Sequence, residues 1–312
     1  MKITKSCSLC KNANLKLLFY GKDKNFHIPG KFPILECRKC RLIFMGIVPD
    51  SKELEKYYPK EYYSYTPIDS KGFKFKMKIF LYNLYFNKKK GDYLSKMLFS
   101  PFLPFVRGVI ISPGKKLLDI GSGSGQFLYE MKQLEMNGQG LEPGSFDEKS
   151  ARKYELNIKN TDLLGAKYPK EYFDIITMNH VLEHVPNPAK EIEEIYRILN
   201  KKGKFIVAVP NYRSLAFFLF GKNWYQLDVP RHLNDFSDKI LVKELKGQGF
   251  RIERVRYNSR PTQFSISLLY SMNINPKKHP FLTNFLNLFF LPATYFVNSI
   301  RLGDQIEVYC SK

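Results

Sequence analysis

Short apolar runs alternate with helical patterns over the second two-thirds of the chain. The first run, residues 117–120, is mostly apolar, as in a buried strand, and a helical pattern follows it directly. That pattern places four apolar side chains on one face: Phe127, Leu128, Met131 and Leu134. Further strand patterns lie at residues 138–142, just before 160, and at 173–178, 205–209, 250–257 and 304–310. This alternation predicts an α/β domain with a parallel sheet and helices on both faces.

Capping residues and glycines predict where the helices begin and end. Asn187 as N-cap before Pro188 predicts a helix that ends near Gly203. Ser237 predicts the N-cap of a helix that ends near Gly247. Gly138 predicts the end of the helix that follows the first strand.

The first strand runs into a glycine turn, L-L-D-I-G-S-G-S-G, between Leu117 and Gly125. Glycine lets the backbone approach a ligand closely, so strand, turn and helix together predict a nucleotide-cofactor cradle. The dinucleotide fingerprint has the spacing G-x-G-x-x-G and holds pyrophosphate at the helix N-terminus. Here the spacing is G-x-G-x-G, and Asp119 stands two residues before the first glycine. A carboxylate there suits a ligand with an ammonium and a sulfonium group and no phosphate, as in S-adenosylmethionine.

Two more acids follow the next two expected strands. Glu142 lies 17 residues after Gly125, close to the roughly 20 residues expected for a carboxylate that binds ribose. Asp162 follows the short strand that ends before residue 160. Both residues are therefore candidates for the same cofactor site.

Four segments resemble the class I S-adenosylmethionine-dependent methyltransferases, in the branch of ubiquinone-pathway and sugar methyltransferases. They are L-L-D-I-G-S-G-S-G, G-L-E-P-G, F-D-I-I-T-M-N-H-V-L-E-H-V and K-G-K-F-I-V-A-V-P-N, in family order between about Lys115 and Asn211. The resemblance implies a Rossmann-like seven-stranded sheet whose last strand is antiparallel. The alternative is a doubly wound domain of another kind.

The resemblance also implies which residues bind the cofactor. These are Asp119, Gly121, Ser122, Gly123, Gly125, Glu142, Asp162, Leu163, Asn179 and His180. Glu142 would accept both ribose hydroxyls, and Asp162 with Leu163 would lie beside the adenine.

Histidines provide the candidate bases, because a hydroxyl acceptor must lose its proton and histidine titrates near neutral pH. His184 lies at the expected ligand edge of the sheet, and His232 lies in P-R-H-L, which resembles a substrate-side motif of the branch. The alternative for each is a structural histidine that holds a loop. No carboxylate cluster indicates catalytic magnesium, so we expect metal-independent transfer.

Four of the five cysteines form two C-x-x-C pairs, Cys7 with Cys10 and Cys37 with Cys40. Four thiolates in this spacing predict a closed structural zinc site, with disulfides or a redox pair as the alternative. Such a module would stabilise a segment too short to bury a core of its own. Cys310 is expected to be a buried strand residue.

Length and composition allow one large and one small domain. The chain has 312 residues, 44% of them hydrophobic and 25% charged, which is typical of a globular protein. We expect a zinc ribbon at 1–50, a basic and apolar helical connector at 51–112, and a methyltransferase domain at 113–312. Apolar insertions are expected at about 212–235 and 258–300. The sequence shows no signal-peptide pattern, which favours the cytoplasm.

Almost half of the net charge of +21 comes from the segment Lys71–Lys116, most of which is the connector. Between Lys71 and Lys116 there are eleven Lys or Arg against one acid, among large apolar side chains. This pattern suits an anionic membrane surface or a nucleic acid, and a general bias toward lysine is the alternative. The apolar stretch 281–300 favours a membrane over RNA, as an interfacial or hairpin-like element, and a packed apolar cap is the alternative.

These observations together predict methyl transfer to a hydroxyl of a sugar or lipid-linked glycan precursor, as in polysaccharide biosynthesis. A quinone-type lipid acceptor is one alternative. RNA or protein recognised through the zinc ribbon is another, and a cofactor-binding scaffold without turnover is the non-enzymatic one. The oligomeric state is left open.

Overall fold

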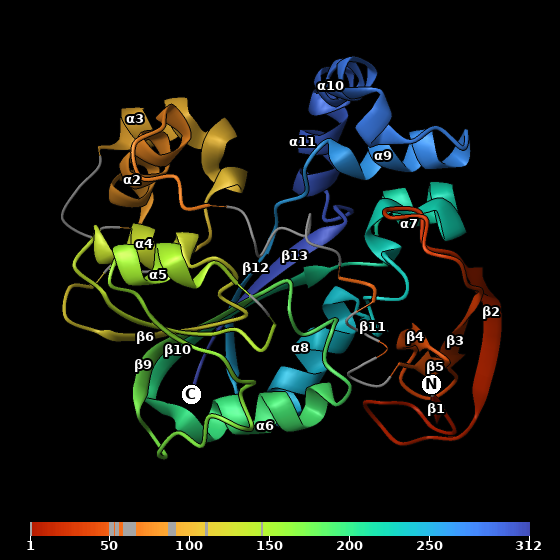
Figure 1. Ribbon diagram of the computed structural model, residues 1–312, viewed down its shortest axis with the longest axis horizontal. Helices are drawn as coiled ribbons and strands as arrows, with labels where there is room; N and C mark the ends of the chain where they lie inside the picture. The colour runs from red at the N-terminus through yellow and green to blue at the C-terminus, as the bar shows by residue number, and fades with distance from the viewer. Residues whose placement is uncertain are drawn as a thin grey trace.

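The structure is a computed structural model in which a large α/β sheet and a small N-terminal β-sheet lie next to each other (Figure 1). The structure describes residues 2–49, 53, 56–58, 67–86, 92–109, 112–144 and 146–312. The expected boundary between residues 50 and 51 lies outside these residues. So do Lys88, Lys89 and Lys90 of the basic connector.

The large sheet has seven strands in the order β12-β13-β10-β9-β6-β7-β8. The strands are β6 (Lys116–Ile120), β7 (Asn137–Leu141), β8 (Asn157–Lys159), β9 (Phe173–Asn179), β10 (Leu199–Pro210), β12 (Arg251–Tyr257) and β13 (Gln305–Ser311). The ladders β9–β10, β9–β6, β6–β7 and β7–β8 are parallel, and β13 pairs antiparallel with both β10 and β12. The predicted Rossmann-like sheet with an antiparallel last strand is confirmed.

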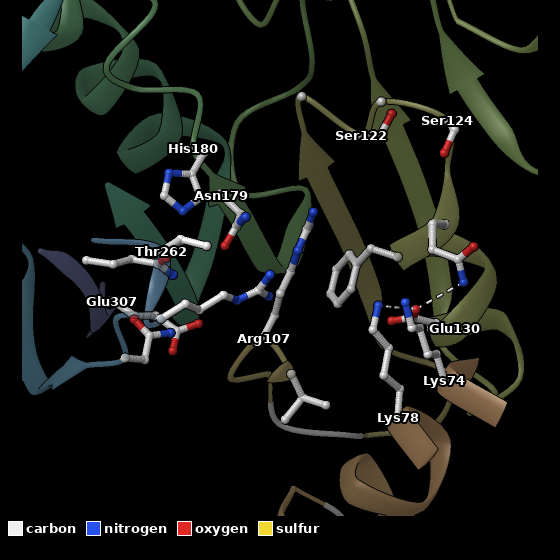
Figure 2. A pocket seen from close by; sticks show the side chains of 18 of the residues that line it. Lys74, Lys78, Arg107, Ser122, Ser124, Glu130, Asn179, His180, Thr262 and Glu307 are labelled. Carbon is white, nitrogen blue, oxygen red and sulfur yellow. Dashed lines mark hydrogen bonds and ion pairs between the residues drawn. The ribbon is translucent and has the colours of Figure 1, made fainter. Parts of the chain in front are cut away.

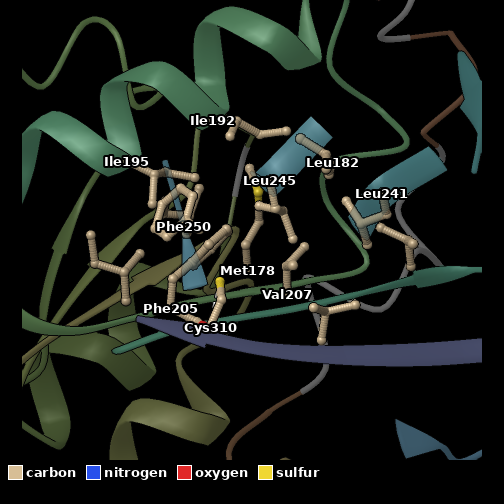
Figure 3. Close-up of a cluster of buried hydrophobic side chains, with 14 of the residues drawn as sticks. Met178, Leu182, Ile192, Ile195, Phe205, Val207, Leu241, Leu245, Phe250 and Cys310 are labelled. Carbon is tan, nitrogen blue, oxygen red and sulfur yellow. Dashed lines mark hydrogen bonds between the residues drawn. The ribbon is translucent and has the colours of Figure 1, made fainter. Parts of the chain in front are cut away.

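Helices cover both faces of this sheet, as the alternating pattern predicted. On one face, α6 (Pro188–Ile198) and α8 (Asp238–Gly247) pack Ile192, Ile195 and Leu245 against strand residues such as Phe205 (Figure 3). On the other face lie α2 (Phe73–Tyr85) and α4 (Gln126–Lys132). Cys310 is 1% exposed in this core, which confirms it as a buried strand residue.

The N-terminal sheet contains a strand from the second half of the chain. Its order is β11-β4-β3-β2, with β2 (Leu15–Gly21), β3 (Phe32–Cys37), β4 (Ile43–Met45) and β11 (Asn234–Asp235). A separate two-stranded ladder joins β1 (Lys2–Ile3) to β5 (Ile47–Val48). Because β11 pairs with β4, the N-terminal module is built into the larger domain and is not a freely attached unit.

Two predicted helix ends are wrong, and one predicted cap is not formed. Helix α4 ends at Lys132, and Gly138 lies inside β7. Helix α6 ends at Ile198, and β10 begins at the next residue, so Gly203 belongs to a strand. Asn187 occupies the N-cap position of α6, but its side chain makes no capping hydrogen bond. Pairing with the neighbouring strands therefore overrides the local glycine signals.

Most of the remaining helices in the described part of the chain lie above the carboxyl edge of the sheet, and α5 lies beside α4 (Figure 1). They are α3 (Tyr93–Phe99), η2 (Ser100–Phe105), α5 (Glu148–Lys153), α7 (Leu215–Phe220), η3 (Gly221–Asn223), η4 (Tyr225–Leu227), α9 (Thr262–Ser271), η5 (Pro276–Lys278), α10 (Pro280–Phe289) and α11 (Leu291–Ser299). Within the described residues, no individual helix has both the length and the apolar character to cross a membrane. Only α10 and α11 taken together do, and they are bent by 48°.

Candidate active site

The glycine turn after β6 adopts backbone conformations that favour glycine. Gly121, Gly123 and Gly125 have φ angles of 69°, 56° and 85°. A Cβ atom on Gly121 would lie 2.2 Å from Cγ2 of Val181, so no larger residue fits there without displacing that side chain. The turn therefore presents bare backbone at the carboxyl edge of the sheet, as the sequence predicted.

The Glu142 carboxylate is hydrogen-bonded to the backbone of this turn. Its Oε2 accepts a hydrogen bond from the Gly123 amide at 2.8 Å, and its Oε1 accepts one from the Gly144 amide at 3.1 Å. Burial raises the pKa of Glu142, while the two amides oppose the shift. Each carboxylate oxygen keeps a lone pair for a hydroxyl donor.

The Asp119 carboxylate is held by other side chains of the protein. Its side chain is fully buried, and Arg107 donates to both of its carboxylate oxygens at 2.9 and 3.1 Å. Thr177 Oγ1 donates to the same carboxylate at 2.7 Å. Arg107 also stacks on Phe127 and lines the adjoining cavity. The sequence predicted that a positively charged ligand lies next to Asp119. In the structure Arg107 supplies that positive charge.

A cavity of about 790 Å³ lies at this edge of the sheet (Figure 2). The predicted site residues on its wall are Gly121, Ser122, Gly123, Asn179, His180, His184 and His232. Five others are not on its wall: Asp119, Gly125, Glu142, Asp162 and Leu163. The Asp162 carboxylate accepts from the Gly165 amide at 2.6 Å, and Leu163 is buried. One cavity therefore joins the glycine turn to both candidate bases.

The cavity fits S-adenosylmethionine by size and by chemistry. Its volume falls within the roughly 300–1,000 Å³ of small-molecule sites. The Ser122 hydroxyl is buried and has no hydrogen-bond partner in the part of the chain that the structure describes, although Ser122 lines the cavity. A buried hydroxyl without a partner is costly, and a bound ligand would remove that cost. The open glycine turn supplies bare backbone on the cavity wall, and Glu142 is hydrogen-bonded to that turn.

Both candidate bases are held through one ring nitrogen. His184 Nδ1 lies 3.0 Å from the Arg231 carbonyl oxygen, and His232 Nδ1 lies 2.7 Å from the Gln226 carbonyl oxygen. A carbonyl only accepts, so each Nδ1 carries the proton and each Nε2 keeps its lone pair. The two rings meet edge to face with centroids 4.7 Å apart.

Burial keeps both imidazoles neutral. It lowers the pKa of His184 to about 4, with the neighbouring His232 adding to the shift. Burial likewise lowers the pKa of His232 to about 4, against the opposing effect of Asp228. Near pH 7 both rings are therefore proton acceptors.

An ion-pair network holds the loop that carries His232. Arg231 is fully buried and binds Asp23 of the N-terminal module through Nη2 at 2.8 Å. It also binds Asp228 through Nε and Nη2 at 2.9 and 2.6 Å. The carbonyl oxygen of Arg231 accepts the hydrogen bond from His184 Nδ1, and His232 is the next residue in the chain. This network therefore fixes the positions of both histidines.

His180 and Glu183 add two more polar groups beside the histidine pair. His180 Nδ1 lies 3.0 Å from Glu183 Oε1, and the Glu183 side chain is fully buried. One ligand atom each from Glu183, His184 and His232 lie within 4.8 Å of one another. These three residues could hold a metal ion, a site that the sequence analysis did not predict.

The four predicted zinc ligands converge. Cys7 Sγ lies 3.5 Å from Cys40 Sγ, Cys10 Sγ lies 3.5 Å from Cys37 Sγ, and all four sulfurs lie within 4.8 Å of one another. Tetrahedral zinc with bonds of about 2.3 Å places its sulfurs slightly under 4 Å apart. The cluster therefore fits a zinc ion.

Several functional residues escaped the sequence analysis. Arg107 lies in the basic connector, where Lys and Arg are frequent, so the sequence does not distinguish it from its neighbours. Asp23 lies more than 200 residues from Arg231, and no local pattern pairs them. Asp228 could have been found, because an acid three residues before a buried arginine in the same loop is a natural partner for it.

Comparison with known families gives a match over just over half of the chain. Residues 93–255 match the family described as Methyltransferase domain. This range contains the glycine turn, Glu142 and both candidate bases.

Curated relatives cover a smaller part of the chain. The ubiquinone biosynthesis O-methyltransferase of Pseudomonas aeruginosa (strain UCBPP-PA14) is 30% identical over 141 residues, 42% of this chain and 61% of that protein. The enzyme of the same name from Pseudomonas entomophila (strain L48) is 29% identical over 142 residues, again 42% of this chain and 61% of that protein. The chain thus matches less than two-thirds of the length of either relative.

Solved structures of similar fold include a SAM-dependent methyltransferase from Archaeoglobus fulgidus. It has a TM-score of 0.43 and 18% identity, and the match covers 75% of this chain and 99% of that one.

Proposed function

The chain belongs to the methyltransferase domain family, and on that premise we propose that it transfers a methyl group from S-adenosylmethionine to an acidic hydroxyl. The observation that carries this proposal is one cavity with a glycine turn at one end and two neutral imidazoles at the other. Each imidazole keeps an Nε2 lone pair, as general-base catalysis requires.

The glycine-turn end would hold the cofactor. Glu142 would accept the ribose hydroxyls, and Asp162 with Leu163, which follow β8, would border the adenine. Arg107 would face the carboxylate of the methionine part, and Asp119 would act as the positioning residue for Arg107. When bound, S-adenosylmethionine supplies an electrophilic methyl group, and the protein contributes mainly by aligning the acceptor with it.

The histidine end favours an acidic hydroxyl over an alcohol. A base of pKa about 4 is weak. Taking a proton from a phenol of pKa about 10 is uphill by about 6 units, and each unit is about 1.4 kcal/mol. An alcohol with a pKa nearer that of water, about 15.7, adds up to about 6 more units. A phenolic ring of quinone type is therefore the acceptor we favour, and the named activity of the Pseudomonas relatives supports it.

A sugar hydroxyl is the second candidate. Six residues with amide side chains line the cavity in the described part of the chain: Asn25, Gln126, Asn179, Gln226, Asn258 and Gln305. Amides that both donate and accept suit a ligand with several hydroxyls.

Label transfer separates the candidates. The full chain is incubated with methyl-labelled S-adenosylmethionine and, separately, a catechol with a short prenyl tail, a glycan-precursor extract or total RNA. Label in the catechol that is lost with His232→Ala supports the proposal. Label only in the glycan fraction supports the second candidate and overturns the first. Label in RNA, or cofactor binding without any transfer, overturns both.

The metal question has its own experiment. If Glu183, His184 and His232 act without an ion, protein whose four cysteines stay loaded with zinc will turn over equally with and without added magnesium. Turnover that requires added magnesium would instead assign these residues as metal ligands and remove the histidines as bases.

A further inference from the structure

The described structure exposes an apolar helix face beside the cavity. Helix α10 contains no buried residue. Its side chains Phe281, Phe285, Leu288 and Phe289 are 85, 58, 71 and 66% exposed, and Phe296 of α11 is 63% exposed. We call these five residues the apolar crest. Soluble proteins rarely leave so contiguous an apolar surface in water, so the crest requires a partner.

The sequence segment that carries the crest has only positive formal charge. The sequence has no Asp or Glu between Glu253 and Asp304. Lys277 and Lys278 directly precede α10, and Arg301 directly follows the last turn of α11. A second copy of this chain would bring the same cations face to face, which disfavours self-association. An anionic surface would compensate for them.

A second group of lysines lies next to the same helices. Lys22, Lys24 and Lys222 line a small depression with Tyr270 of α9, and Lys24 Nζ donates to the Tyr270 carbonyl at 2.9 Å. Burial lowers the pKa of Lys24, and Lys222 and Lys22 lower it further. Asp228 also lines this depression but is already paired with Arg231, so it offsets the charge of the three lysines only in part.

We propose that the apolar crest docks the protein on an anionic lipid surface, with α10 lying in the interface and the flanking lysines among the headgroups. Rings and leucines on one helix face beside lysines are the pattern of an interfacial helix. The bend of 48° between α10 and α11 suits a pair that lies on a bilayer. Helix α9, which contacts α10, begins with Thr262 on the cavity wall, and α3 exposes Leu94 and Leu98 at the same upper edge (Figure 1). Docking would therefore bring the cavity close to the lipid.

Vesicle sedimentation tests this inference without any methyl transfer. The full chain is spun with phosphatidylcholine vesicles that contain one-third phosphatidylglycerol, and with phosphatidylcholine alone, at moderate salt. We expect binding to the anionic vesicles. Replacing Phe285 and Phe289 together by serine should weaken that binding by about tenfold or more, because two rings leave the interface.

A matched control uses exposed apolar residues on another face. Leu17 and Tyr20 of β2 are 46 and 56% exposed, and replacing both by serine should leave vesicle binding unchanged. Unchanged thermal unfolding and S-adenosylmethionine binding would confirm that both double variants fold. The proposal is overturned if the wild type does not bind anionic vesicles, or if the crest variant binds as well as the wild type, which would indicate lysine-driven adsorption of any polyanion. It is also overturned if the wild type is a dimer that the crest substitutions dissociate.

Discussion

The two ends of the cavity are built in different ways. The glycine-turn end comes almost entirely from β6, the turn and β7, within about thirty consecutive residues. The histidine end joins His184 after β9, His232 in the loop after β10, and Asp23 from the N-terminal module. The difference teaches that the glycine-turn end is a local feature of this chain, whereas the histidine end depends on contacts between distant segments. Substitutions at one end should leave the other intact, and the predictions below test that separation.

The largest expected effect is on turnover. His232→Ala should reduce kcat by roughly 10²–10⁴-fold, the usual contribution of a positioned base, and leave the Kd for S-adenosylmethionine unchanged. Label transfer and calorimetry measure the two quantities. A variant with unchanged turnover would remove His232 as the base, and a weakened Kd would show that the two ends are coupled.

The next effect is on folding. Arg231→Ala leaves the carboxylates of Asp23 and Asp228 in a buried site without their cation. Removing one member of a buried ion pair costs about 3–5 kcal/mol, so the free energy of unfolding should fall by that amount. Denaturant unfolding measures it, and Arg213→Ala is the control because the Arg213 pair is half exposed at 3.6 Å. Equal losses in the two variants would contradict the central role of this network.

Glu142→Ala tests the other end. Two backbone amides and two ribose hydroxyls would lose their acceptor. Hydrogen bonds to a charged group contribute about 1.5–3 kcal/mol, so the Kd for S-adenosylmethionine should rise by roughly 10–100-fold. Turnover at saturating cofactor should be retained. Glu148→Ala is the control, since that acid is exposed on α5 and pairs only with Arg152. Normal cofactor affinity in Glu142→Ala would refute the ribose assignment.

A smaller effect on turnover tests how the N-terminal module, which carries the four clustered cysteines, supports the histidine end of the cavity. Ser8, next to Cys7, donates to Asn234 Oδ1 at 2.5 Å, and Asn234 donates to the Val185 carbonyl at 2.8 Å, one residue after His184. Ser8→Ala removes one partly buried hydrogen bond, worth about 1 kcal/mol. Turnover should fall by about fivefold at most, while the Kd for S-adenosylmethionine stays unchanged. Removing the metal from the cysteines by chelation should act in the same direction, and a change confined to cofactor affinity would contradict the connection.

The smallest effect is on the pH profile. With pKa values of about 4, both histidines stay neutral down to pH 5.5, so turnover at pH 5.5 should remain within about twofold of its value at pH 7.5. In the unfolded chain the pKa of each histidine is near 6.5. As the pH falls, the unfolded state therefore binds protons at a higher pH than the folded state does. Stability should therefore be full above pH 6.5 and decrease as the pH falls from 6.5 toward 4. A turnover midpoint near pH 6.5 would show that the histidines are not buried as described.

Sequence patterns predicted the strands of the large sheet, the four cysteines, and His184 and His232 as candidate bases. The antiparallel last strand was implied by the resemblance to class I methyltransferases, and the convergence of the cysteines follows from their C-x-x-C spacing. The helix ends predicted at Gly138 and Gly203 are wrong, because pairing between strands outweighed the usual preference of glycine for helix ends. The direction of Asp119 could not be predicted either, because Arg107 reaches it from a connector without a distinctive pattern.

The sequence by itself determined the sheet, the glycine turn and the two cysteine pairs, since each depends on spacing within a few turns or strands. Only the tertiary structure decided that β11 joins the N-terminal sheet, that Asp23 holds Arg231, and that His184 and His232 share one neutral cluster. The physical reason is that backbone conformation and hydrophobic periodicity act locally. Burial, ion pairing and the pKa values that follow from them depend on which distant segments pack together.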